Sequence, residues 1–253
     1  MSRRGLPQVV RVGLELTDGM NFYPAVTPQV KIENVEHKGI LYHRFLFTSL
    51  HGTYVETRRH VKSVFGDNGT WAADGFRARG QAYDLFRAVV VHVKVKPGEA
   101  VDVSQIEKGL KLLREGDAFI VDFNNYTPDH LSFDERYNLN APYFTAEAMA
   151  AINKRKPLLL GGNTPSFSNP REDERKPCGK EFGIKQIIQF FSLSPNNMVL
   201  APLTNLREVR ETVVALKVNP LPIQETCGVP CSPEIYQGWK GRQELRYLEE
   251  LAG

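Results

Sequence analysis

The segment Ser49–His60 holds the densest group of side chains that could transfer protons. Within it, Glu56 and His60 stand four residues apart. An extended segment would place Tyr54, Glu56 and His60 on one face, and a helical turn would also bring Glu56 beside His60. A carboxylate next to an imidazole orients the ring and tunes it for general acid or base catalysis near neutral pH. The spacing therefore predicts a proton-transfer pair.

Two arginines, Arg58 and Arg59, lie between the members of this pair. Their guanidinium groups could hold a carboxylate-bearing substrate or a developing oxyanion without a metal. The alternative interpretation is structural. Glu56 and the arginines would then form a solvated ion-pair network, and His60 would be a hydrogen-bonded structural histidine.

The three cysteines, Cys178, Cys227 and Cys231, are an odd number in a chain long enough to fold without disulfides. We therefore expect reduced thiols and a cytoplasmic protein. The spacing of Cys227 and Cys231 could suggest a metal knuckle, but a second pair is missing. Basic neighbours of Cys178 favour a thiolate, so it is either a nucleophile or, with no histidine near it in sequence, an incidental loop cysteine.

The composition excludes several classes of function. A net charge of +3, with 42% hydrophobic and 24% charged residues, is ordinary for a globular protein and argues against a nucleic-acid partner. No apolar run approaches the roughly 18 residues of a membrane span, and residues 5–11 lack the apolar core of a signal peptide. The chain has neither a glycine-rich nucleotide loop nor a Gly-x-Ser-x-Gly elbow. We expect a small-molecule substrate and no membrane partner.

Strands and helices alternate in the middle of the chain, which predicts an α/β fold with some parallel pairing. The first helix of this region should begin with a capping box formed by Ser104 and Glu107 and end near Gly116. The other helices are expected at about 145–153, 184–191 and 242–251. Strands are expected at 9–16, 30–35, 42–50, 89–95, 118–121, 158–160, 198–201 and 213–218, with antiparallel or mixed pairing in the N-terminal third. No interdomain linker is visible, so residues 1–253 are interpreted as one domain.

Four segments resemble, in order, the landmarks of the cyclase family that includes kynurenine formamidase and isatin hydrolase. Leu16–Pro24 is similar to its Asp-Gly-Met-Pro-x-Tyr-Pro turn, and Leu50–His60 to its His-x-Gly-Thr-His-x-Asp-x-Pro-x-His signature. Gly162–Ser166 resembles Gly-Ile-Asp-Thr-Pro-Ser, and Leu203–Leu206 resembles part of Glu-Asn-Leu-x-Asn-Leu. The resemblance implies a swivelling β/β/α-type fold, with mixed sheets around a barrel-like core and outer helices, and a homo-oligomer.

Members of that family are typically zinc or manganese hydrolases that open an amide or lactam. Carried over position by position, the signature ligands fall on Leu50, Tyr54, Glu56 and His60, so only the last histidine is kept. The downstream glutamate falls on Ala201 and a preceding histidine falls near Gln189. Leucine and alanine have no donor atoms. His51 is one residue displaced from the lost ligand, which on a strand sends its side chain to the opposite face.

We therefore expect no cofactor, although zinc or manganese could bind at Glu56 and His60 if other ligands complete a site. By the same resemblance, Tyr54 would be a hydrogen-bond donor in place of a lost ligand. Tyr23 could stack on a planar substrate, or it simply packs beside Pro24. Two amides could bind a substrate carbonyl or instead tie down the backbone, namely Gln189 and Asn205.

These features predict a divergent enzyme acting on a small polar carbonyl compound. The reaction would be hydrolysis of an amide, lactam or lactone, or the reverse dehydrative cyclisation or an elimination, by metal-independent acid–base chemistry. Two alternatives stay open. The chain could be a non-catalytic member that binds a ligand or a partner, or a metal-dependent formamidase-like hydrolase with rearranged ligands.

Overall fold

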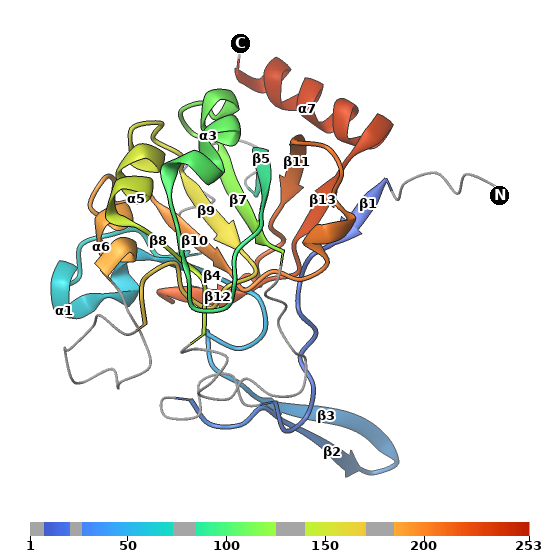
Figure 1. Cartoon of the computed structure of the whole chain (residues 1–253). Helices are drawn as coiled ribbons and strands as arrows, with labels where there is room; N and C mark the ends of the chain where they lie inside the picture. The colour runs from blue at the N-terminus through green and yellow to red at the C-terminus, as the bar shows by residue number, and fades with distance from the viewer. Residues whose placement is uncertain (1–7, 21–26, 73–83, 125–139, 171–184, 253) are drawn as a thin grey trace.

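A curled nine-stranded sheet forms the body of the molecule (Figure 1). The computed structural model describes residues 8–20, 27–72, 84–124, 140–170 and 185–252. In spatial order the strands are β1 (Val9–Arg11), β13 (Glu234–Tyr236), β11 (Val213–Lys217), β5 (Leu85–Val93), β7 (Ala118–Phe123), β9 (Leu159–Gly162), β10 (Met198–Ala201), β4 (Tyr54–Thr57) and β12 (Gly228–Pro230). The curled sheet forms a half-barrel, which agrees with the predicted barrel-like core.

The four central strands, β5, β7, β9 and β10, run parallel, and the strands outside them pair antiparallel. Parallel neighbours need crossover connections, and the crossovers carry three helices. These are α3 (Val103–Leu112), α5 (Ala146–Asn153) and α6 (Lys185–Phe191). The α/β class and the parallel pairing predicted from the sequence are therefore confirmed.

The start of α3 differs from the prediction. Asp102, not Ser104, is the N-cap, because its side chain accepts hydrogen bonds from the backbone N–H groups of Ser104 and Gln105. The side chain of Gln105 returns the contact by accepting from the backbone N–H of Asp102. Asp and Gln satisfy this reciprocal pattern as well as the Ser and Glu of the motif, two residues earlier in the chain.

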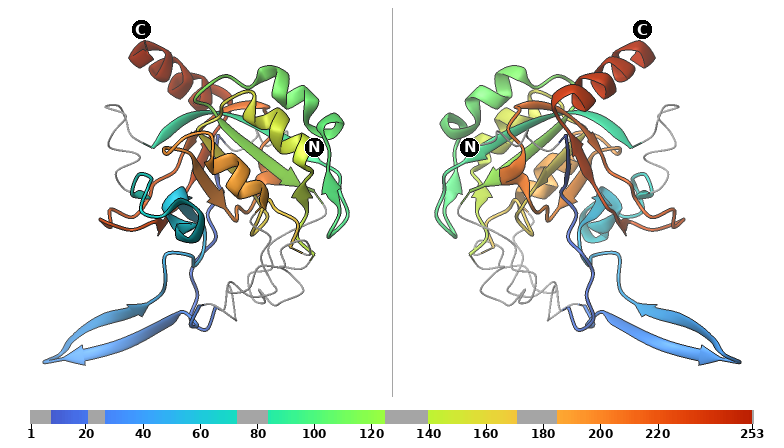
Figure 2. Two further views of the ribbon diagram at one scale, coloured as in Figure 1. Left: turned by 90° about the vertical axis from the view of Figure 1, so that its left-hand side faces the viewer. Right: turned by 90° about the vertical axis from the view of Figure 1, so that its right-hand side faces the viewer.

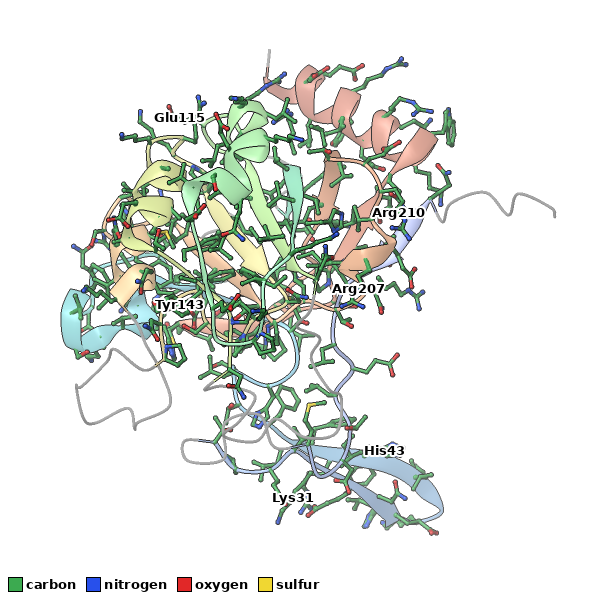
Figure 3. All side chains as sticks on the ribbon, in the orientation of Figure 1. Lys31, His43, Glu115, Tyr143, Arg207 and Arg210 are labelled. Carbon is green, nitrogen blue, oxygen red and sulfur yellow. The ribbon has the colours of Figure 1, made fainter. Side chains whose placement is uncertain are left out.

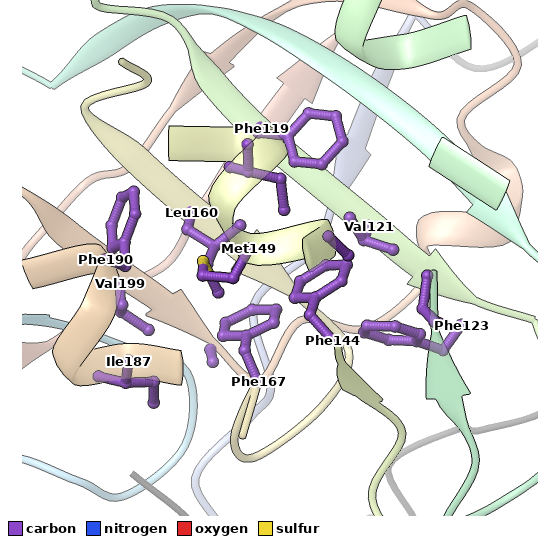
Figure 4. Close-up of a cluster of buried hydrophobic side chains, with 14 of the residues drawn as sticks. Phe119, Val121, Phe123, Phe144, Met149, Leu160, Phe167, Ile187, Phe190 and Val199 are labelled. Atoms are coloured by element: carbon purple, nitrogen blue, oxygen red, sulfur yellow. The ribbon is translucent and has the colours of Figure 1, made fainter. Parts of the chain in front are cut away.

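Two apolar layers cover the two faces of the sheet because side chains alternate along each strand. On β5, Val89, Val91 and Val93 belong to the layer beneath the helices, while Phe86 and Val90 belong to the other layer. Figure 4 shows the first layer, which gathers large rings and aliphatic chains from the helices and central strands. Its Phe144 and Phe167 rings stack with centroids 5.8 Å apart.

A two-stranded hairpin projects away from this body (Figures 1 and 2). It consists of β2 (Lys31–His37) paired antiparallel with β3 (Ile40–Leu46), which confirms the antiparallel pairing expected in the N-terminal third. Every residue of β3 is exposed, including Ile40 at 68%, Leu41 at 63% and Phe45 at 59%. An isolated two-stranded hairpin has little stability of its own in water.

The remaining elements are short, apart from the last helix. β6 (Ala100–Val101) pairs with β8 (Tyr143–Phe144), and the others are η1 (Arg58–His60), α1 (Lys62–Phe65), η2 (Leu206–Glu208) and α7 (Gly238–Ala252). Helix α7 begins four residues before its predicted start because distant side chains bind its first N–H groups. Glu211 accepts from Gly238 at 2.9 Å and Gln8 accepts from Trp239 at 2.8 Å. Within the described residues, no helix is both long and apolar enough to cross a membrane.

Candidate active site

Strand β4 and helix η1 carry the predicted proton-transfer pair. β4 lies between β10 and β12, where Glu56 is the register partner of Val199 on one side and Gly228 on the other. Because η1 turns the chain directly after Thr57, His60 folds back toward Glu56. The Oε2 atom of Glu56 and the Nε2 atom of His60 are 3.7 Å apart. The four-residue spacing therefore does bring carboxylate and imidazole together.

The two members of the pair differ in exposure. The Glu56 side chain is buried at 7% exposure, whereas the His60 side chain is 36% exposed. Burial raises the pKa of the Glu56 carboxyl, although the charge of His60 opposes this. Burial also disfavours a charged His60 ring, but the Glu56 carboxylate and the Cys227 thiol outweigh it and raise the pKa of His60 to about 9.

Cys227 is a neighbour of this pair that sequence reasoning missed. Its Sγ atom lies 3.6 Å from Nδ1 of His60. The contact exists because β12 pairs with β4, which sets the Cys227 carbonyl to accept from the backbone N–H of Thr57 at 2.9 Å. The segment 227–231 contains the strand β12. Nothing in the local sequence could reveal a contact between residues so far apart in the chain.

Arg58 and Arg59 are adjacent to the pair, but both are engaged by the loop that follows. Nε of Arg58 donates to the Asn68 carbonyl at 3.1 Å. Arg59 donates to the Asp67 carbonyl at 2.6 Å, and its guanidinium lies 3.6 Å from the centroid of the Trp71 ring. These contacts are to loop carbonyls and an aromatic ring, which differs from the ion-pair network with Glu56 of the structural interpretation, and anion binding by the two arginines stays a prediction.

Tyr54 lies on the same face of β4 as Glu56 and is buried in the helix-side apolar layer. Two other predicted binding residues, Gln189 and Asn205, make contacts elsewhere in the described structure. Gln189 is half-buried on α6, where its carbonyl accepts from the Asn153 side chain at 3.1 Å. The Asn205 side chain donates to the Arg11 carbonyl at 3.0 Å and lines a separate cavity. Tyr23 and Cys178 lie outside the described residues.

The donors present here do not fit a catalytic metal with three protein ligands. Leu50, Tyr54 and Ala201, which stand at ligand positions of the resembling signature, are part of or packed against the apolar layer. His51 is buried with both ring nitrogens engaged, since Nδ1 accepts from the Thr48 N–H at 2.8 Å and Nε2 lies 2.9 Å from the Pro28 carbonyl. Across the described ranges, no three His, Cys, Asp or Glu side chains gather into a metal-binding group.

Solved structures with this architecture are hydrolases and cyclases by their descriptions. Isatin hydrolase A from Labrenzia aggregata bound to benzyl benzoate superposes with a TM-score of 0.66 at 15% identity, covering 91% of this chain and 94% of that one. Isatin hydrolase A from Ralstonia solanacearum gives 0.65 at 18% identity, covering 90% of each chain. A potential metal-dependent hydrolase with cyclase activity gives 0.62 at 14% identity, covering 91% and 98%.

The chain shares the fold of these proteins. The predicted resemblance to the cyclase family and the predicted fold are thereby confirmed at the level of the fold. No protein-family model and no curated protein matches the chain by sequence. Activity, substrate and the part played by a metal must therefore be argued from this chain's own residues.

Proposed function

We propose that the protein is an enzyme acting on a small carbonyl compound, with Glu56 and His60 as its proton-transfer pair. The supporting observation is the 3.7 Å approach of the Glu56 carboxylate to the His60 imidazole, one buried and the other partly exposed. The exposed ring can reach a substrate, and the buried carboxylate holds its orientation. The substrates we propose are amides, lactams or lactones, or the open-chain acids that close to them.

The protonation state of the pair indicates that His60 would donate a proton in the first step. With a pKa of about 9, His60 is an imidazolium at neutral pH and can donate a proton. Water would attack the carbonyl carbon and release a proton to solvent, and His60 would protonate the leaving nitrogen or oxygen as the carbonyl–heteroatom bond breaks. Glu56 would stabilise the charged ring before this transfer. Tyr54, two residues before Glu56 on the same face of β4, is kept as the proposed hydrogen-bond donor.

A His60→Ala variant tests this proposal. Loss of a general acid typically lowers the rate by about 10²- to 10⁴-fold, so turnover of any substrate found in a panel of aryl formamides, lactams and lactones should fall by that factor. The melting temperature should change little because the ring is partly exposed. His43→Ala on the hairpin is a matched control, since it removes a histidine that is exposed and outside the pair. Turnover like the wild type in His60→Ala contradicts the assignment.

The contact between Cys227 and His60 favours a second mechanism for the same class of reaction. A Cys227 thiolate would attack the carbonyl carbon, His60 would protonate the leaving group, and water would then hydrolyse the thioester. Cys227→Ser separates the two mechanisms, because a nucleophilic enzyme loses turnover and an acid–base enzyme keeps most of it. Cys231→Ser is the control, since burial raises the pKa of that thiol well above its usual value.

A non-catalytic binding protein is the remaining alternative of another class. Thermal-shift screening against the same compounds separates it from an enzyme, because compounds would then raise the melting temperature and be recovered unchanged. Conversion of any stabilising compound by the wild type, lost in His60→Ala, favours the enzyme.

We also propose that the chain forms a homo-oligomer, as the resemblance implies. The exposed apolar side chains of β3 support this, because large side chains on both faces of a projecting hairpin lose contact with water only against another surface. Sedimentation of the wild type and of a Leu41→Ser, Phe45→Ser variant tests the proposal. The wild type should sediment as an oligomer and the variant as a smaller species, and a monomeric wild type would contradict it.

A further inference from the structure

A second pair of histidine and carboxylate lies in the middle of the sheet, at a cavity of about 490 Å³. The described residues that line the cavity are His92, Asn124, Arg207, Val209 and Arg210. Three of these are basic and none is acidic. A second cavity, of about 560 Å³, differs because Glu15 and Glu234 line it together with Arg11. Positive charge is therefore concentrated at the first cavity, whereas charges of both signs line the second.

The sheet places this cavity at the ends of its parallel strands. His92 on β5 is the register partner of Asp122 on β7, and both are close to the carboxyl ends of their strands. Asn163 directly follows β9, and its amide donates to the second oxygen of Asp122 at 3.0 Å. Ligands of open α/β sheets bind at the carboxyl ends of the strands, where loops rather than strands supply the walls.

Hydrogen-bond partners on both sides of the ring favour the charged form of His92. Its Nδ1 lies 2.8 Å from Oδ2 of the fully buried Asp122, and its Nε2 lies 3.0 Å from the Val209 carbonyl. A carbonyl oxygen only accepts, and so does an ionised carboxylate, so an imidazolium, which donates from both ring nitrogens, fits these two partners. In agreement, the hydrogen bond to Asp122 raises the pKa of His92, although burial and the charge of Arg210 act against it.

Hydrogen bonds with Gln237 hold the backbone of the segment that carries the two arginines. The buried Gln237 accepts a hydrogen bond from the Arg210 backbone N–H at 3.0 Å and donates to the Glu208 carbonyl at 3.2 Å. Arg207, on η2, and Arg210, two residues after η2, are both exposed (Figure 3). In the part of the chain that the structure describes, neither arginine forms an ion pair. The fixed backbone thus presents these two guanidinium groups to one cavity.

We propose that this cavity binds a small organic molecule through an anionic oxygen group, a carboxylate or a phosphate, held by Arg207 and Arg210. Guanidinium groups match both oxyanions with two parallel hydrogen bonds. The charge of His92 is balanced by Asp122 at 2.8 Å, so the two arginines carry the positive charge of the cavity, and the Asn124 amide offers a further donor. The volume exceeds that of a bare ion and lies within the range of small-molecule sites.

The test is titration calorimetry in a chloride buffer of low ionic strength, with inorganic phosphate and benzoate as separate probes. We expect the wild type to bind at least one probe, and an Arg207→Gln, Arg210→Gln variant to bind it at least tenfold more weakly. Phosphate alone or benzoate alone supports the proposal and assigns the anion class. Absence of binding of both probes overturns it.

Two controls show whether binding is specific to this cavity. Arg242→Gln, Arg246→Gln removes two arginines from α7, and an equal weakening there would show that binding is unspecific attraction to positive charge. His60→Ala should bind the probes like the wild type, so the outcome does not depend on the proposed proton-transfer pair. In NMR spectra, the His92 ring resonances should shift with bound probe and those of His60 should not.

Discussion

Two pairs of histidine and carboxylate in one sheet differ in how tightly they are held. Asp122 and His92 stand on adjacent central strands, 2.8 Å apart, with the second ring nitrogen bound to a carbonyl and the second carboxylate oxygen bound to an amide. Glu56 and His60 stand on β4 and η1, 3.7 Å apart, with a thiol as the other neighbour of the ring. In the first pair, both ring nitrogens and both carboxylate oxygens have hydrogen-bond partners, which favours the charged form of His92. In the second pair, the carboxylate approaches the ring less closely and the ring is partly exposed, so the ring can exchange a proton with a bound substrate.

The largest expected difference between the pairs is in folding stability, measured with matched amide variants. Asp122→Asn removes charge-assisted hydrogen bonds to His92 and Asn163, so the free energy of unfolding should fall by about 2 kcal/mol. Glu56→Gln removes a buried charge whose partner His60, at 3.7 Å, is partly exposed, so the change should stay within about 0.5 kcal/mol. Urea denaturation of both variants checks this. Equal losses would show that the two pairs are held alike.

A second difference lies in the pH dependence of stability. The folded-state pKa of His92 is raised above 6.5, chiefly by the Asp122 hydrogen bond, with Arg207 and Arg210 as the other charged groups at its cavity. Its stabilisation is therefore complete below pH 6.5 and lost as the pH rises through the folded value. The corresponding loss for His60 occurs through pH about 9.

Comparing the wild type with His92→Gln and His60→Gln at pH 6, 8 and 10 measures these windows. Because both rings are about a third exposed, each contribution should stay below about 1 kcal/mol. The cost of either substitution should be smaller at pH 10 than at pH 6. A cost that does not change with pH would mean that the ring is neutral in the folded protein.

The smallest expected effect concerns the repulsion between Arg210 and His92. Removing a like charge from a charged ring should stabilise the protein, so Arg210→Gln should raise the free energy of unfolding by about 0.5 kcal/mol at pH 6. The NMR titration midpoint of His92 should rise in the same variant, while that of His60 stays unchanged. A lower midpoint for His92 would contradict the charge arrangement of the cavity.

The sequence predicted what depends on local spacing. Glu56 and His60 could be paired from sequence because a helical turn over four residues brings two side chains near each other, and η1 supplies such a turn. The parallel strands at the centre of the sheet could also be predicted, because apolar runs alternate there with segments of helical periodicity. The start of α7 could not be predicted, because Gln8 and Glu211 bind its first N–H groups from remote parts of the chain.

The rest depends on strand register, which a single sequence does not contain. Cys227 reaches His60 only through the pairing of β12 with β4, and His92 meets Asp122 only through the pairing of β5 with β7. A signal for the second pair was present, because His92 and Asp122 are single polar residues near the ends of apolar runs. Polar groups in a buried strand need partners, and that requirement could have linked them.

The order of strands in the sheet also determines when the protein can fold. β1 (Val9–Arg11) pairs with β13 (Glu234–Tyr236), and β4 finds its second neighbour in β12. β1, at one edge of the sheet, and β4, next to the other edge, thus depend on partners that follow them by more than 150 residues in the chain. Before residue 236 has been synthesised, β1 and one edge of β4 lack the strands that complete their pairing. Contacts of such long sequence separation slow folding, and the growing chain leaves apolar strands uncovered until those partners have been made.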